Sequence, residues 1–236
     1  MLVDTSFDFR ADAGGKDPDT YSPTLCRYHQ LLWSKPLPGG VRFELDATGS
    51  APYYLHHRSE VGEFWLSSDA VIPTYTRYGV PKAVIQQFSD ADNDAFNAIG
   101  YTIGGLILWP ANRIDGQWTI NQARGCLRNI ADRMDLTLES IRRHYRAQWS
   151  PLHEVLARYR DFFAVFESFR GYVDFWLLQD LVTDDYSAVR FFMPFDEFRP
   201  PSIPQDIDSY REYRRRSIEF VQARNRRIDL LEIDPR

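Results

Sequence analysis

The sequence predicts an α+β fold, with a mostly antiparallel sheet from the N-terminal half and a helical C-terminal half. Two patterns predict it. Short apolar or alternating segments, separated by turn residues, occur between residues 41 and 110, whereas apolar residues spaced three or four apart dominate after Gly116. A chain of 236 residues with 44% hydrophobic and 15% aromatic content can bury one sizeable core, so we expect a single domain.

The N-terminal half divides at its turn residues. Residues 1–24 are rich in Asp, Gly, Ser and Pro, and we expect an extended N-terminal arm there. The domain then covers 25–228 and leaves 229–236 as a C-terminal tail. The expected helices of this half are 24–33, 80–88 and 92–99, the last with Asp90 or Asp92 as N-cap. The expected strands are 41–46, 52–57, 64–72 and 101–109, the last continuously apolar and therefore fully buried.

The C-terminal half is read mainly as helices. The expected helices are 120–133, 136–148, 151–166, 171–182 and 206–228, and 187–195 is expected to return as a strand. Ser150 followed by Pro151 is typical of an N-cap and a first helical position. Gly125 weakens the first of these helices.

Composition excludes several classes of protein. A net charge of −5 argues against non-specific coating of nucleic acid. No apolar run is long enough to span a membrane, so no membrane partner is expected. The two cysteines, Cys26 and Cys126, give no metal-binding spacing and favour a reducing, cytoplasmic location. There is no phosphate-binding P-loop, dinucleotide fingerprint, HExxH or CxxC motif, so no cofactor and no metal are expected.

A candidate anion site follows the buried strand. Residues 112–146 carry seven arginines against four acids, a net charge of about +3 within an acidic chain. Thr119 or Asn121 could cap the next helix, and helix N-termini and guanidinium groups both favour phosphate or carboxylate. The predicted ligand-binding residues are Asn112, Arg113, Asn121, Arg124 and Arg128, with His144 as an outer candidate. The alternative is that these arginines form ordinary surface ion pairs with nearby acids.

The histidines provide weaker catalytic candidates. His56, His57, Ser59, Ser68 and Asp69 could place a base beside a serine, although adjacent histidines on a strand point to opposite faces. Arg146 and His153 lie seven residues apart, which resembles loosely the arginine–histidine pair of helical HEPN ribonucleases. The weak catalytic candidates are His57, His144, His153 and Arg146.

The last helix carries many arginines but nearly as many acids. Residues 205–236 contain eight arginines and seven acids. Side chains four apart share a helix face, so oppositely charged pairs can form along it. We therefore expect a solvated face with i,i+4 ion pairs rather than a nucleic-acid-binding surface.

Several longer motifs point to one family. They include RYHQLLWSKPLP (27–38), HHRSEVGEFWLSSDAV (56–71), TIGGLILWPANRIDG (102–116), TINQARG (119–125), DRMDLTLESIRRHY (132–145), YRDFFAVFESFRGYVDFWLLQDLV (159–182) and FFMPFDEF (191–198). With these motifs the chain resembles, over roughly residues 4–228, a bacterial family known only as a domain of unknown function. The resemblance implies a single-domain protein and no particular activity.

Three functions follow from these observations. The first is a cytoplasmic protein that binds a phosphate-bearing ligand, a nucleotide or RNA, in a cleft lined by Arg and Asn. The second is an enzyme, a metal-independent ribonuclease or a nucleotidyl-modifying toxin of a bacterial defence system. The third is a protein-interaction partner without a ligand site. The sequence does not decide whether the chain is an enzyme.

Overall fold

The sheet of the protein has four antiparallel strands in the order β1-β2-β3-β4, which confirms the α+β class. The computed structural model describes residues 3–50, 53–72, 79–200 and 202–232. The strands are β1 (Asp46–Ser50), β2 (Tyr53–Ser59), β3 (Gly62–Ala70) and β4 (Leu106–Pro110). The first three form a meander, and the chain returns to β4 after a helical segment.

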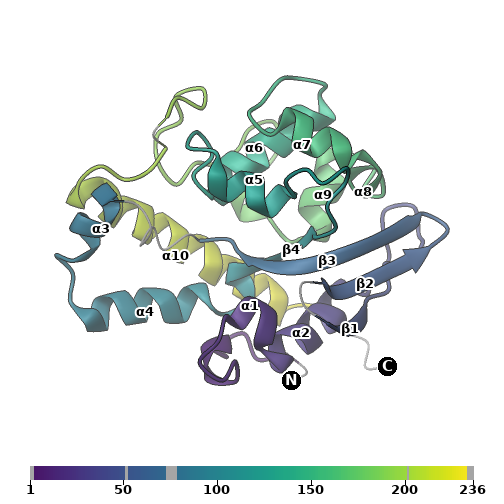
Figure 1. Ribbon diagram of the computed structural model, residues 1–236, viewed down its shortest axis with the longest axis horizontal. Helices are drawn as coiled ribbons and strands as arrows, with labels where there is room; N and C mark the ends of the chain where they lie inside the picture. Colours follow the sequence, from purple (N-terminus) through teal and green to yellow (C-terminus); the bar gives the residue numbers. More distant parts are fainter. Residues whose placement is uncertain (1–2, 51–52, 73–78, 201, 233–236) are drawn as a thin grey trace.

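Helices cover both faces of this sheet (Figure 1). Helices α5 to α9 gather on one side, and α1 and α2 lie on the other, with the long α10 running beside the sheet. The helices before β4 are η1 (Phe9–Ala11), α1 (Pro18–Tyr21), α2 (Pro23–Trp33), α3 (Gly79–Ile85), α4 (Asp90–Gly100) and η2 (Ile103–Gly105). Those after it are α5 (Ile120–Cys126), α6 (Met134–Tyr145), α7 (His153–Arg158), α8 (Arg160–Ala164), α9 (Phe169–Phe175), η3 (Gln179–Leu181) and α10 (Ile207–Asp229).

Strand β4 lies at the edge of the sheet but inside the protein, and all five of its residues are buried. The register pairs Leu66 with Pro110 and Ala70 with Leu106. The Val71 N–H donates to the Gly105 carbonyl and the Ala111 N–H to the Trp65 carbonyl. By the antiparallel alternation, Leu106 and Pro110 direct their backbone groups to the free edge. Proline suits such a position because it has no N–H to leave unpaired.

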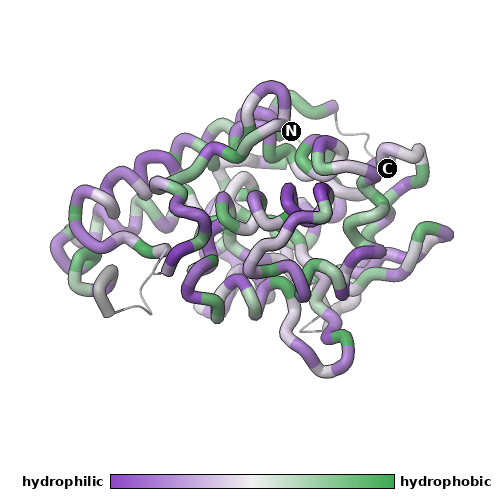
Figure 2. Tube along the Cα trace, turned by 90° about the horizontal axis from the view of Figure 1, so that it is seen from above, coloured by the Kyte–Doolittle hydropathy of each residue, from purple (hydrophilic) through white to green (hydrophobic). Residues whose placement is uncertain are grey.

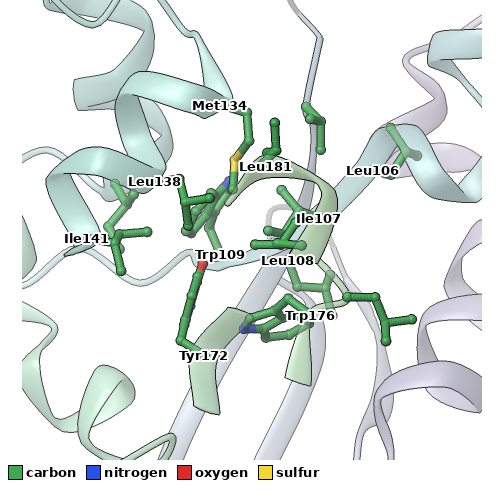
Figure 3. Packing of buried hydrophobic residues seen from close by; sticks show 14 of the residues in the cluster. Leu106, Ile107, Leu108, Trp109, Met134, Leu138, Ile141, Tyr172, Trp176 and Leu181 are labelled. Atoms are coloured by element: carbon green, nitrogen blue, oxygen red, sulfur yellow. The ribbon is translucent and has the colours of Figure 1, made fainter. Parts of the chain in front are cut away.

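The core joins β4 to the helices α6 and α9 and to the turn η3. Figure 3 shows the side chains of β4 packed with those of α6, α9 and η3. The labelled residues are Leu106, Ile107, Leu108, Trp109, Met134, Leu138, Ile141, Tyr172, Trp176 and Leu181, all of them buried. A strand buried on both faces needs apolar residues at every position, so its sequence is continuous rather than alternating.

The predicted strand 101–109 begins later than expected, because residues 103–105 form the turn η2. Helix α10 packs closely on this turn. The Gly104 N–H donates to Asn225 Oδ1 at 2.7 Å. A Cβ on Gly104 would lie 2.5 Å from that oxygen and 2.6 Å from the Val221 carbonyl oxygen. Glycine is therefore required by the close approach of α10, and the turn displaces the start of the strand.

Several helices are shorter than the apolar spacing predicts. The helix expected over 136–148 ends at Tyr145, where Ala147 has a φ of 52° and the Gln148 N–H donates to the Arg143 carbonyl. The helix expected over 171–182 ends at Phe175, where Leu177 has a φ of 56°. Left-handed residues close helices in this way, but the residue is usually glycine. Because Ala147 and Leu177 are not glycines, the sequence carried no signal that the two helices end there.

Two more helix predictions need correction. The helix expected over 120–133 ends at Cys126, and the Asp132 N–H donates to the Arg124 carbonyl. The helix expected over 151–166 is divided into α7 and α8. Ser150 is not its N-cap, because α7 starts at His153 and the Ser150 carbonyl instead accepts the His153 N–H in a turn.

The returning strand expected at 187–195 is absent from the described residues, apart from one bridge between Val182 and Val189. The backbone N–H and C=O groups of this segment form hydrogen bonds with side chains instead. The Phe192 N–H donates to Asp135, and Arg216 donates to the Phe191 carbonyl at 2.7 Å. Backbone groups that already have partners need no neighbouring strand.

The N-terminal half also differs from expectation in detail. Residues 41–46 are not a strand, because β1 begins at Asp46 and the Phe43 N–H donates to the Lys35 carbonyl. Residues 3–24 contain η1 and α1 rather than an extended arm, and Phe9 is fully buried in the core. Ser89, rather than Asp90 or Asp92, is the N-cap of α4.

Hydrophobic and hydrophilic residues alternate over short distances along the chain (Figure 2). Within the described residues no helix is both long and apolar enough to cross a bilayer. The longest helix, α10, buries one stripe, as the sequence predicts, and carries charged residues on its other face. Its buried residues include Tyr210, Tyr213, Phe220, Val221 and Ile228.

The close contact at Gly104 gives a test of the fold. We expect Gly104→Ala to lower the free energy of unfolding by about 1–3 kcal/mol, because the new Cβ overlaps α10. Chemical denaturation followed by circular dichroism measures this. The matched control is Gly100→Ala in α4, where a Cβ meets no atom within 4 Å. Equal stability of the two variants would contradict the packing of α10 on η2.

Candidate functional site

The predicted ligand residue Arg124 lies inside the protein with no exposed surface. Its guanidinium forms an ion pair with Asp69 of β3 and donates to the Asp132 carbonyl at 3.0 Å. The Nε–H donates to Thr137 Oγ1 at 3.0 Å, and the guanidinium carbon lies 5.3 Å from the ring centre of Trp109. All these contacts join α5 to the sheet and to α6. Arg124 therefore meets carboxylates of the protein itself rather than a solvent-filled hollow.

Burial perturbs the carboxylates around Arg124. Burial raises the pKa of Asp69 to about 7, with Arg124 opposing the shift and Asp132 adding to it. Burial, together with the charge of Asp69, raises the pKa of Asp19 well above its usual range. Oδ1 of Asp19 is buried and has no hydrogen-bond partner among the described residues. One arginine thus faces several acids, so this cluster has no surplus positive charge for an anion.

The other predicted ligand residues lie outside this cluster. Asn112 is half-buried, and its carbonyl accepts the Tyr159 hydroxyl at 2.7 Å. Asn121 is half-buried on α5, while Arg113 and Arg128 are exposed. The buried guanidinium of Arg124 is not presented to solvent beside them.

The predicted catalytic histidines occupy different surroundings. The His57 Nδ1–H donates to the Glu44 carbonyl at 2.8 Å, so Nε2 accepts from the Ser59 hydroxyl at 2.9 Å. The ring stacks on Phe43 at 4.2 Å, and burial lowers the pKa of His57 to about 4. A base of such low pKa is weak near neutral pH.

His144, Arg146 and His153 lie at the ends of α6 and α7. His144 is half-buried, and burial, with a smaller effect of His153, lowers its pKa. Arg146 is exposed at the C-cap of α6, and His153 is exposed at the start of α7.

A buried histidine–serine pair that the sequence reasoning missed joins α2 to β3. The Trp33 Nε1–H donates to His29 Nδ1 at 2.9 Å. His29 Nε2 therefore carries the proton and donates to Ser68 Oγ at 3.0 Å. Burial lowers the pKa of His29 to about 3, so the imidazole stays neutral. A histidine that donates to the serine cannot act as its base, and we interpret the pair as structural.

The best-formed arginine-lined hollow lies along α10. It has a volume of about 410 Å³ and is bounded by α10 on one side and by the segments around residues 180 and 191 on the other. Side chains three or four apart on α10 share a face, which brings Arg215, Glu219 and Arg226 to the same side. The small side chain of Ala223 leaves room between them. The complete lining is Asp180, Leu181, Arg190, Phe191, Phe192, Arg215, Arg216, Glu219, Phe220, Ala223 and Arg226.

The arginines of this pocket are exposed and only partly paired. Arg215 pairs with Glu212 at 2.7 Å and with Glu219 at 2.6 Å, and Arg216 pairs with Glu212 at 2.6 Å. The Arg215–Glu219 and Arg216–Glu212 pairs are the i,i+4 pairs expected of the last helix, and Arg215–Glu212 adds an i,i+3 pair.

Two arginines of the lining are held less firmly. Arg190 pairs with the fully exposed Asp184 at 3.0 Å. Arg226 forms no ion pair with any described residue, and it is exposed. With four arginines against Asp180 and Glu219, the lining itself carries a net charge of +2.

A comparison with protein families matches residues 3–228 to a family of unknown function, DUF6994. The chain belongs to DUF6994. The match covers nearly the whole chain, so the DUF6994 unit is the complete α+β domain described above. No curated protein and no solved structure matches this DUF6994 chain.

We expect Arg124→Met to lower the free energy of unfolding by about 3–5 kcal/mol, because it leaves buried carboxylates without their counter-charge. Thermal and chemical denaturation measure this loss. The control Arg128→Met changes an exposed arginine close by in the chain and should be nearly neutral. Partial recovery in the double variant Arg124→Met, Asp69→Leu would support the ion pair as the cause. An Arg124→Met protein as stable as its control would contradict this role.

Proposed function

We propose that the protein binds a phosphate-bearing small molecule, a nucleotide, in the arginine-lined pocket of α10. The observation that carries the proposal is one hollow with four guanidinium groups and three phenylalanines in its lining. Its volume of about 410 Å³ falls in the range of small-ligand sites. The proposed anion site therefore lies on α10. It does not lie at the strand end, residues 112–128, where Arg124 is buried.

The exposed arginines supply the phosphate-binding part. Surface ion pairs contribute little, typically 0–1 kcal/mol, so Arg190, Arg215 and Arg216 can exchange their carboxylates for a phosphate at small cost. Arg226 needs no such exchange. A guanidinium can donate two parallel hydrogen bonds to phosphate oxygens, which a lysine cannot match.

Phe191 supplies an apolar surface for a base, whereas Phe192 and Phe220 are almost fully buried. Phe191 is half-buried and stacks on Phe195, with ring centres 4.4 Å apart and planes 5° apart. Arg216 holds the Phe191 carbonyl and thereby fixes this wall to α10. Aromatic faces stack on nucleobases without strong sequence preference. A hollow of about 410 Å³ has room for a mononucleotide but not for several nucleotides of an RNA strand.

The chemistry of the lining supports binding rather than catalysis. It provides two carboxylates but no histidine, serine or cysteine.

Among the described residues Cys26 and Cys126 are free thiols, which suits the cytoplasmic location that we propose.

Isothermal titration calorimetry with adenine and guanine nucleotides and with inorganic pyrophosphate tests this proposal. We expect Arg226→Glu to weaken binding of all these ligands by more than about tenfold, since a charge-assisted hydrogen bond contributes about 1.5–3 kcal/mol. Phe191→Ala should weaken the nucleotides but not pyrophosphate, because it removes only the stacking surface.

The matched control is Arg160→Glu, which reverses an arginine on α8 whose side chain is 80% exposed. It should bind like the unaltered protein. Absence of nucleotide binding at millimolar concentration, or equal affinity of Arg226→Glu and Arg160→Glu, would overturn the proposed function.

A further inference from the structure

A second hollow, remote in sequence from α10, is lined by two exposed tryptophans. It has a volume of about 370 Å³ and lies where the residues before α5 meet the segment that leads into α7. Trp118 is 49% exposed and Trp149 is 66% exposed. Tryptophan is usually highly buried, so two exposed indoles at one hollow form an unusual surface. Such residues are enriched where proteins bind ligands.

Two residues that line the hollow carry buried polar atoms without partners among the described residues. Ser150 is only 2% exposed, and its Oγ has no hydrogen-bond partner among the described residues. Nε of Arg158 is also buried and has no hydrogen-bond partner among the described residues. Nη2 of the same side chain donates to the Trp118 carbonyl at 2.9 Å. Buried polar atoms without partners are costly unless a ligand or water meets them. Because both residues line the hollow, a ligand there would lie beside these unpaired groups.

The charges of the hollow balance. Glu154 and Arg158 contribute one negative and one positive charge, and the remaining polar lining residues are Gln117, Ser150 and His153. The site therefore offers both donors and acceptors without a net field to attract an ion. This balance distinguishes it from the arginine-lined pocket of α10.

We infer that this hollow binds a neutral carbohydrate. A sugar ring has an apolar face of C–H groups, which an exposed indole can cover, and hydroxyl groups at its edge that both donate and accept hydrogen bonds. Trp118 and Trp149 present the aromatic surface, and the exposed Gln117, His153 and Glu154 present polar groups beside it. A proline-rich peptide also uses aromatic surfaces, but it needs an extended groove rather than one compact hollow with unpaired polar atoms among its lining residues.

Tryptophan fluorescence and calorimetry with a panel of neutral mono- and disaccharides test the inference. We expect at least one sugar to shift the fluorescence in a saturable way. Trp149→Ala should weaken that binding by more than about tenfold, while Trp149→Phe, which keeps an aromatic face, should retain part of it. Circular dichroism verifies that the variants are folded.

The control Tyr21→Ala removes another exposed aromatic side chain, 49% exposed, from α1 outside the hollow. Sugar binding by this variant should be unchanged. Absence of binding to every sugar in the panel, affinity unaffected by Trp149→Ala, or binding of proline-rich peptides without binding of sugars would each overturn the inference.

Discussion

Two buried arginines tie the inner strands of the sheet to the helices: Arg224 of α10 binds the free edge of β4, and Arg124 of α5 binds β3. Arg224 donates to the carbonyls of Gly104 and Leu106 at 3.0 and 2.7 Å, and to the Trp176 carbonyl at 3.1 Å. An edge strand normally exposes unpaired backbone groups. Here a guanidinium occupies the free edge, and burial lowers the pKa of Arg224 to about 9. Arg124 joins the neighbouring strand β3 to α5 through Asp69.

The separation of buried from exposed arginines limits where an anion-binding site can lie. The chain has 25 arginines and three lysines, so arginine alone marks no site in the sequence. The structure separates arginines buried for packing, such as Arg124 and Arg224, from exposed ones, such as Arg226. A buried guanidinium already has fixed partners, and removing it leaves those partners unpaired. Our proposal for an anionic ligand therefore uses only exposed guanidinium groups.

Local signals in the sequence predicted local structure well. The buried stripe of α10, the helix α2 and the pair of strands β2 and β3 followed from apolar spacing and turn residues. The ends of α6 and α9 did not, because Ala147 and Leu177 take left-handed conformations without the usual glycine. The predicted ligand site depended on which arginines the fold buries. That outcome is set by contacts such as the one between Arg124 and Asp69, 55 residues apart, which no local pattern encodes.

The most direct test of this account is the exchange of arginine Nε protons with solvent, followed by NMR of ¹⁵N-labelled protein after transfer to D₂O. Arg124 and Arg224 should keep their Nε–H signals as long as the best-protected backbone amides, since both guanidinium groups are buried and hydrogen-bonded. Signals of exposed arginines such as Arg226 should vanish at once. Loss of the Arg124 and Arg224 signals at the rate of Arg226 would contradict the claim that these buried arginines tie β3 and β4 to the helices.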